Sequence, residues 1–279
     1  MSSTADVIGG AAEAAAAPRN ARGAARWLAR RNWLGILLPA IILAVWQTAA
    51  TRQWIEPVFL PQPLKVVQAF WTMLTTQDLL HDFLASIGIV GQAFIYGSVA
   101  GVGLGIAAGL SRRMERFVGP TFDTLRHIPA IAWFPLIVLW LGLGAPAKVL
   151  VISKSVFFPV FLNTLQGIRG VDKSYIELAQ VLTLTRWQLA RKVILPAATP
   201  SIMVALRYAA GLAWAMVVVA EGLSGLVGLG FLIFRAQSLL MTDQLLVCMV
   251  VIGVVGFTID RGMSLLQRRV LRWKQGYDG

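Results

Sequence analysis

Four basic residues lie in or beside apolar stretches of this sequence, where a charge is costly and therefore indicates a function. These residues are Arg126, Lys148, Lys154 and Arg207. Charged side chains in such stretches usually line a pathway, form a relay or pair with one another. A cavity lined by cations lowers the barrier to an anion without binding it tightly. The pattern therefore predicts the passage of a small anion rather than a covalent reaction.

The predicted substrate pathway consists of Arg207, Lys154, Arg126, Trp214 and Glu221. Asp123 can pair with Arg126 because the two are three residues apart on a helix. No acidic residue is an obvious local partner for Lys154 or Arg207. Other roles remain open: Arg207 could bind backbone carbonyls, Lys148 could reach the lipid headgroups, and Trp214 could serve packing alone.

The sequence offers little for an enzyme. It has no G-x-x-x-x-G-K-[ST] loop for ATP and no serine in a G-x-S-x-G setting. Its two histidines, His81 and His127, do not form a cluster at metal-ligand spacing. The single cysteine, Cys248, lies in an apolar run, so disulfides are not expected. We expect neither a metal nor a cofactor bound by this chain.

The composition places the chain in a membrane. Of its residues, 57 % are hydrophobic and 14 % are charged, and the mean hydropathy is +0.70. Soluble domains have about 45–50 % apolar and 25 % charged residues. We therefore expect an all-α integral membrane protein, because a helix satisfies its own backbone groups in lipid.

About six apolar segments approach the length of roughly 20 residues that a span needs. Pro129 and Pro135 are expected to kink the third of these segments, and 64–74 is a short amphipathic candidate for the membrane interface. Gly97, Gly101, Gly105 and Gly109 repeat every four residues in the second segment, so a helix can approach that face closely, either from the same subunit or across a dimer. The six segments are 32–51, 83–110, 119–141, 146–165, 200–220 and 244–259.

The basic residues fix the predicted topology. With six spans and the N-terminus inside, the outer segments hold only Arg52, Lys65 and Arg235, whereas every inner segment is basic. Such an excess marks the cytoplasmic side. The net charge of +12 is then a topology signal and an attraction to anionic lipid, and a nucleic-acid role has no support. The predicted organisation is a disordered basic cytoplasmic tail (1–31), a transmembrane domain (32–262) and a basic cytoplasmic tail (263–279).

The segment 172–196 between the fourth and fifth spans is polar, basic and amphipathic, unlike the rest of the chain. We call it the elbow. Ser174 and Glu177 have the form of a capping box, as do Thr185 and Gln188, so two short helices are expected, the second ending before Pro196. Such a pair makes a protruding knob that suits docking to another protein. Within the first helix, one face is formed by Ile176, Ala179, Gln180 and Thr183.

The elbow resembles the "EAA" loop of ATP-binding-cassette importer permeases. Glu177 and Ala179 match its pattern, Leu195 and Pro196 fall at the expected distance, and Val193 stands for an isoleucine. Leu178 replaces the middle alanine. Thr183 replaces a glycine, and because Thr adopts φ > 0 less readily, a differently made bend is expected. The segments 126–144, 157–172 and 200–221 extend the resemblance to permeases for sulfonates, taurine, nitrate or bicarbonate.

This resemblance implies a type I importer permease fold with a cytoplasmic coupling helix. Two ATPase subunits would grip the elbows of two permease copies, and ATP-driven closure would switch the dimer between inward-open and outward-open states. A periplasmic or lipid-anchored binding protein would deliver the substrate at the inner membrane of a bacterium. The residues carried over to the ATPase contact are Glu177, Ala179, Thr183, Arg186 and Pro196.

The resemblance favours aliphatic sulfonates as substrate. Nitrate, taurine or bicarbonate import remains an alternative. A secondary anion transporter is a more distant one, because that class often has internal repeats, whereas the two halves of this sequence show no convincing similarity. That class also does not explain the elbow.

Overall fold

The computed structural model describes residues 37–76 and 79–273, which are entirely helical, turn or loop. The chain divides into two units, 1–63 and 64–279. In the first unit, the described part is an apolar helix, Leu37–Thr51, and a loop that returns along it. The indole N–H of Trp46 donates to the carbonyl of Pro61 at 3.0 Å and holds the loop there. The predicted tail at 1–31 lies outside the described residues.

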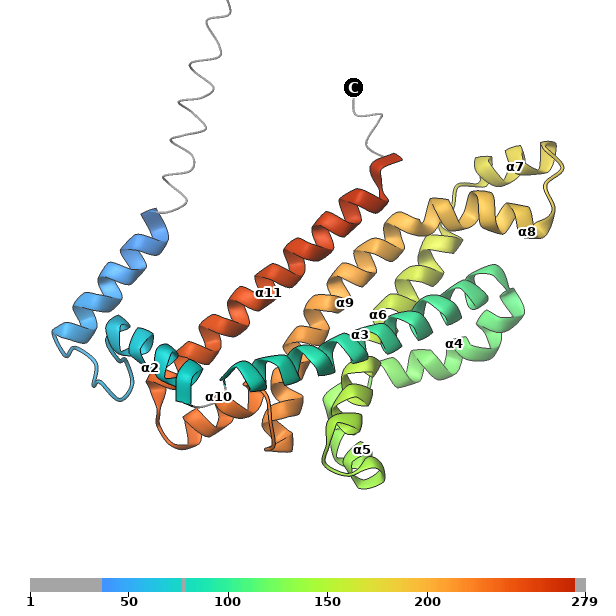
Figure 1. Cartoon of the computed structure of the whole chain (residues 1–279). Helices are drawn as coiled ribbons and strands as arrows, with labels where there is room; N and C mark the ends of the chain where they lie inside the picture. Colours follow the sequence, from blue (N-terminus) through green and yellow to red (C-terminus); the bar gives the residue numbers. More distant parts are fainter. Residues whose placement is uncertain (1–36, 77–78, 274–279) are drawn as a thin grey trace, which may run out of the picture. The chain divides into compact units, whose positions relative to one another are not determined.

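The second unit begins with a short helix and is built around three long ones. Helix α2 (Pro63–Thr76) buries Val66, Ala69 and Met73 on one face, which confirms a helix over 64–74. Its place in the membrane interface stays a prediction. The long helices are α3 (Leu79–Leu110), α6 (Ala145–Arg169) and α9 (Leu195–Ser224). Helix α6 lies between the other two and makes the most extensive contacts of the unit with both (Figure 1).

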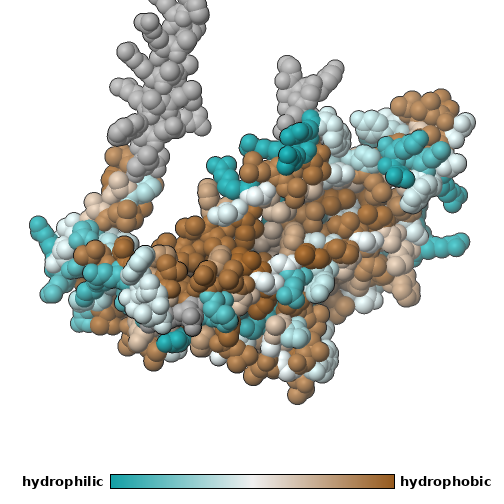
Figure 2. All heavy atoms as spheres, in the orientation of Figure 1, coloured by the Kyte–Doolittle hydropathy of each residue, from teal (hydrophilic) through white to brown (hydrophobic). Residues whose placement is uncertain are grey.

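Two further helices complete this unit at its C-terminal end. A tight Gly-containing turn after α9 leads into α10 (Leu229–Ser238), and α11 (Thr242–Val270) packs on α9 and α10. Hydrophobic residues cover α11 and α9 on the face seen in Figure 2, as expected for helices that meet lipid or a partner. Helix α11 continues without a break past the predicted end of the transmembrane domain at 262 to Val270, and the boundary between span and tail stays a prediction.

The predicted third span is sharply broken. Helix α4 (Arg112–Arg126) ends at a turn, and a short 3₁₀ helix, η1 (Ala130–Trp133), leads into α5 (Phe134–Leu141). The two halves meet at 89°. Pro129 is extended, with ψ at 138°, and it cannot donate a helical N–H. The predicted kink at Pro129 is therefore confirmed, whereas Pro135 fits into the first turn of α5, where proline is tolerated.

Within the described residues, four helices are long and apolar enough to cross a membrane, or five if the bent pair forms one span. The shorter apolar helix Leu37–Thr51 is the described part of the predicted first span. These segments agree with the predicted all-α membrane architecture.

The four-residue glycine repeat of α3 lies against α6. A methyl group on Gly97 would lie 2.6 Å from the carbonyl oxygen of Ser153, and one on Gly105 would lie 2.7 Å from Cβ of Thr164. Gly101 and Gly109 meet the same helix at similar distances. Of the two alternatives, the structure shows packing within one chain, because only glycine lets these backbones come so close.

Replacing Gly105 with alanine should therefore destabilise the protein, by about 1–3 kcal/mol, because the added methyl group overpacks a tight contact. The matched control is Gly103→Ala, where no atom lies within 4 Å of the new methyl group. That variant should melt at or above the wild-type temperature, since alanine favours helix. The melting temperatures of both variants are measured by thermal unfolding in detergent, with size-exclusion chromatography to monitor the loss of folded protein. Equal melting temperatures for the two variants would contradict this packing.

Candidate functional site

The first helix of the elbow, α7 (Lys173–Val181), is capped by Asp172 rather than by Ser174. The Asp172 carboxylate accepts hydrogen bonds from the backbone N–H and the hydroxyl of Ser174, both at 2.9 Å. These bonds lower the pKa of Asp172 below its usual value. The predicted Ser174–Glu177 capping box is therefore wrong, because an ionised aspartate two residues upstream takes the same backbone donor. Glu177 is left exposed on the surface.

In the turn that follows this helix, Thr183 adopts the left-handed conformation with φ at +53°. The N–H of Leu184 donates to the carbonyl of Ala179 at 3.1 Å, and the N–H of Thr183 donates to that of Gln180 at 2.9 Å. These two bonds form a Schellman motif, which usually has glycine at the left-handed position. The expectation of a differently made bend is therefore wrong: Thr183 makes the bend that a glycine would make, at a cost in strain.

Thr183→Gly should therefore stabilise the folded elbow by about 1 kcal/mol, since a left-handed conformation costs an L-residue about 1–2 kcal/mol and flexible glycine loses more entropy on folding. Hydrogen exchange of the α7 amides should slow about fivefold. Thr183→Val, which keeps a β-branched side chain at this position, serves as the control and should not slow exchange. Unchanged or faster exchange in the glycine variant would show that Thr183 is not strained.

The second half of the elbow is continuous with a transmembrane helix. The Thr185–Gln188 capping box is confirmed, with the Thr185 N–H donating to Gln188 Oε1 at 3.0 Å and the Gln188 N–H donating to Thr185 Oγ1 at 3.4 Å. Helix α8 (Arg186–Leu189) then passes through a π-helical turn, Ala190–Ile194, into α9. The predicted end before Pro196 is wrong, because Pro196 lies in the first turn of α9, next to the widened turn.

The elbow carries an exposed apolar stripe that sequence reasoning missed. Tyr175, Leu178 and Leu182 are 57–61 % exposed, and at spacings of three and four residues they share one face of α7. Val181 beside them is 78 % exposed. Figure 2 shows hydrophobic residues over this part of the elbow. The face identified from the sequence is a different one, on which Ala179 is buried at 3 % exposure. The same helical spacing, counted from Tyr175, would have found the stripe.

The structure gives Arg207 an acidic partner. Its guanidinium donates from Nε and Nη2 to the two carboxylate oxygens of Asp260 at 2.7 and 2.8 Å. Asp260 lies 53 residues away on α11, which is why no local partner was visible in the sequence. The structural hydrogen bond considered for Arg207 therefore goes to a distant carboxylate rather than to backbone carbonyls. The pair joins α9 to α11, and bidentate geometry fixes their register.

The other predicted pathway residues lie in separate surroundings. Arg126 pairs with Asp123 at 3.3 Å, as expected. Lys154 projects from α6 into a cavity and donates to the carbonyl of Ile128 at 2.9 Å. Trp214 is buried, and its indole N–H donates to the carbonyl of Ile252 at 3.0 Å. The structure thus does not bring the five predicted residues into one site, and their roles in a pathway stay predictions.

Glu221 belongs to a buried polar cluster at the start of α10. Its carboxylate, which is fully buried, accepts from the hydroxyl of Ser86 at 2.8 Å and from the N–H of Gly230 at 2.9 Å. Ser86 in turn accepts from the N–H of Leu229 at 3.0 Å. The Asp82 carboxylate accepts from the N–H of Gly228. Side chains from α3 (Asp82 and Ser86) and α9 (Glu221) thereby satisfy three successive N–H groups at the start of α10, which have no partner within the helix.

Lys148 lies beside this cluster. It is buried at 3 % exposure, and its ammonium group donates to the carbonyl of Val227 at 3.1 Å. The headgroup role considered for Lys148 does not fit this position, because its side chain turns inwards to hold the loop before α10. The cluster therefore joins α3, α6, α9 and α10.

The sequence of this chain is similar to a known family of membrane transport proteins and to individual permeases. Residues 101–272 match the family model described as "Binding-protein-dependent transport system inner membrane component". The chain is similar to the aliphatic sulfonates transport permease protein SsuC of Bacillus subtilis, with 37 % identity over 251 residues that cover 90 % of this chain and 91 % of the relative. It is also similar to the taurine transport system permease protein TauC of Escherichia coli, with 36 % identity over 89 % of this chain and 92 % of that protein.

The fold is also found among solved structures. The chain is similar to a subunit of the methionine transporter MetNI in an inward-facing conformation, with a TM-score of 0.59 and 17 % identity. The match covers 77 % of this chain and 99 % of that one. This likeness establishes the architecture of the helices.

Proposed function

Because this chain belongs to the family of binding-protein-dependent transport system inner membrane components, we propose that it imports small organic anions, with aliphatic sulfonates as the favoured class. In this proposal the chain forms the membrane pathway and does not hydrolyse ATP itself. Two copies of a separate ATPase subunit would supply the energy, and a periplasmic or lipid-anchored binding protein would deliver the substrate. The similarity of the chain, over about 90 % of its length, to the permease proteins SsuC and TauC supports an anion of the sulfonate type.

The observation that carries the ATPase contact is the exposed apolar stripe of the elbow. Three large apolar side chains on one face of a short helix are unfavourable in water and favourable in a groove of a partner. The surrounding basic residues, which include Arg186 and Lys173, favour the cytoplasmic side. The proposed orientation places both termini and the elbow in the cytoplasm of a bacterium, with the chain in the inner membrane.

The continuity of the elbow with α9 supports a mechanism of coupling. From Arg186 to Ser224 the chain forms 39 residues of helix, so a displacement of the elbow is transmitted along α9. The buried polar cluster then links the far end of α9 to α10. In a dimer of two such chains, closure of the ATPases would draw the two elbows together and rotate these rigid groups of helices, which alternates access to the pathway.

Import can be tested in proteoliposomes that contain this chain, its ATPase and the binding protein. Addition of 1-hexanesulfonate to the binding-protein side should stimulate ATP hydrolysis, and labelled sulfonate should accumulate only when ATP is present. Stimulation by nitrate, bicarbonate or taurine instead would replace the favoured substrate with one of these alternatives. Uptake that follows an ion gradient and ignores ATP would favour a secondary anion transporter and contradict the proposal.

A further inference from the structure

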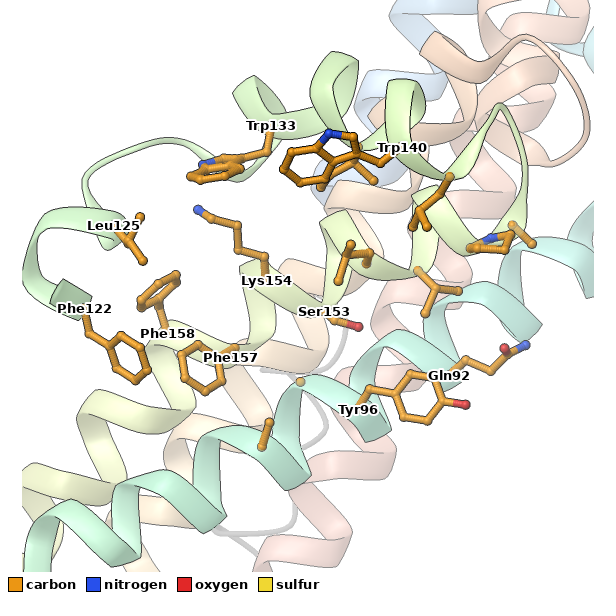
Figure 3. Close-up of a pocket in the computed structure, with 18 residues that line it drawn as sticks. Gln92, Tyr96, Phe122, Leu125, Trp133, Trp140, Ser153, Lys154, Phe157 and Phe158 are labelled. Carbon is orange, nitrogen blue, oxygen red and sulfur yellow. The ribbon is translucent and has the colours of Figure 1, made fainter. Parts of the chain in front are cut away.

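A cavity of about 840 Å³ lies between α3, α4, α5 and α6. Figure 3 shows Trp133 and Trp140 along one side of it, Phe122, Phe157 and Phe158 along another, and Tyr96 and Gln92 reaching in from α3. The sharp break at Pro129 creates this space, because it turns α5 away from the line of α4. The volume is within the range of about 300–1,000 Å³ that small-molecule sites occupy.

The lining is mostly apolar and aromatic; its neutral polar groups belong to Gln92, Ser153 and Tyr96, and Lys154 is its single charged side chain. Phe122, Phe157 and Phe158 pack edge to face, with ring centroids 5.1–6.0 Å apart, so this wall is preorganised. No aspartate or glutamate lines the cavity. A ligand that fits such a lining has an apolar body and carries at most one negative group.

Two hydrogen-bond donors meet inside the cavity. The ammonium of Lys154 lies over the rings of Trp133 and Phe158, 5.4 and 5.1 Å from their centroids. It donates one hydrogen bond, to the Ile128 carbonyl, and an ammonium has three donors. Among the described residues it has no carboxylate within 4.0 Å. The buried indole N–H of Trp133 also has no hydrogen-bond partner in the described part of the chain, which is unusual for a buried polar group.

We propose that this cavity is a binding site for the transported molecule and that it selects organic anions with an apolar body, such as alkanesulfonates of several carbons. The oxygens of the sulfonate would accept from the Lys154 ammonium and the Trp133 indole N–H. The alkyl chain would lie among Trp140, Phe157 and Phe158. The inference rests on the proposed function and adds a second selection step, within the membrane, to the one made by the binding protein.

The same lining argues against other anions. An inorganic anion has no apolar body, so it gains nothing from the aromatic walls and loses its hydration. An aminosulfonate carries an ammonium group that Lys154 repels and that no carboxylate in the cavity can pair with. Among molecules with one anionic group, the site therefore favours those in which this group is attached to an apolar body.

Binding can be measured on the purified chain in nanodiscs of uncharged phosphatidylcholine, without binding protein, by the quenching of tryptophan fluorescence. We expect 1-hexanesulfonate to bind, with the affinity falling about two- to fourfold for each CH₂ group removed from the chain. Nitrate and taurine should bind at least a hundredfold more weakly. Equal affinities for hexanesulfonate, methanesulfonate and nitrate would overturn the proposal.

Two variants test the donors separately. Lys154→Gln removes the charge, and Trp133→Phe removes only the indole N–H and keeps an aromatic ring. Each should weaken hexanesulfonate binding about tenfold or more, since hydrogen bonds to a charged group are the strong ones. Lys65→Gln, which removes an exposed lysine of α2, is the control and should bind as the wild type does. Wild-type affinity in both cavity variants would place the sulfonate elsewhere.

Repeating the titration with phosphatidylglycerol in the nanodiscs distinguishes a transported anion from a lipid headgroup. An unchanged affinity for hexanesulfonate supports the proposal, whereas loss of binding would make the cavity a lipid site and overturn it. The outcome is separable from that of the import proposal. ATP-dependent uptake that survives intact in Lys154→Gln would refute this site alone, whereas a chain that shows no ATP-dependent uptake would refute import.

Discussion

Replacing Leu178 with aspartate should reduce substrate-stimulated ATP hydrolysis in proteoliposomes at least tenfold. Leu178 lies in the middle of the apolar stripe on α7 and is 58 % exposed, so the substitution leaves the folded permease intact. In the complex, a carboxylate would enter an apolar groove without a partner. The loss of a central contact in a protein interface costs about 2 kcal/mol or more, which corresponds to more than a tenfold weaker complex.

The control for this prediction is Gln180→Asp, which adds the same charge to α7 on the face away from the stripe. That variant should keep most of the stimulated activity. Both variants should elute as folded protein from size-exclusion chromatography, which separates uncoupling from misfolding. If Leu178→Asp and Gln180→Asp behave alike, the stripe does not form the ATPase contact, and the exposed Glu177 or Arg186 becomes the better candidate.

Replacing Glu221 with alanine should lower the free energy of unfolding by about 3 kcal/mol. The substitution removes the acceptor of two buried donors, the hydroxyl of Ser86 and the N–H of Gly230. Each buried donor left without a partner costs about 1–3 kcal/mol. The released first turn of α10 should also become mobile. Thermal unfolding in detergent measures the first effect, and hydrogen exchange at Leu229 and Gly230 measures the second.

Glu221→Gln separates the hydrogen bonds from the charge. The amide oxygen can still accept from the Gly230 N–H, so this variant should lose clearly less stability than the alanine variant. Glu115→Ala is a second control, because Glu115 forms an ion pair with Arg169 in which both side chains are partly exposed. Exposed pairs contribute about 1 kcal/mol or less. An alanine variant at 221 that melts like the one at 115 would contradict the structural role of the cluster.

The sequence was sufficient to predict the properties that depend on neighbouring residues. Hydropathy over windows of about 20 residues revealed the membrane helices, because a span must be apolar along its whole length. The Thr185–Gln188 cap was also predictable, since its partners are three residues apart. The kink at Pro129 was expected because proline lacks the N–H that a helix needs. The spacing of Glu177, Ala179 and Leu195–Pro196 indicated the family.

Some local predictions failed because more than one local structure is compatible with the same residues. Asp172 and Ser174 can both cap α7, and the sequence does not show which will accept the free N–H. At Thr183, the preference of a β-branched residue against φ > 0 was outweighed by the two hydrogen bonds that close the helix. At Pro196, a π-helical turn allows the chain to remain helical where a break was expected.

Only the tertiary structure decided which distant residues meet. The glycine repeat could have faced a second subunit, and the close approach of α6 shows that it packs within the chain. Asp260 neutralises Arg207 across 53 residues, and Ser86 binds Glu221 across 135. Lys154 and Trp133 belong to different helices, and the break between α4 and α5 creates the cavity they share. Residue patterns and hydropathy describe residues that are neighbours in the sequence. Ion pairs, buried hydrogen bonds and cavities depend instead on how the helices pack, and a short window of sequence holds no information about that packing.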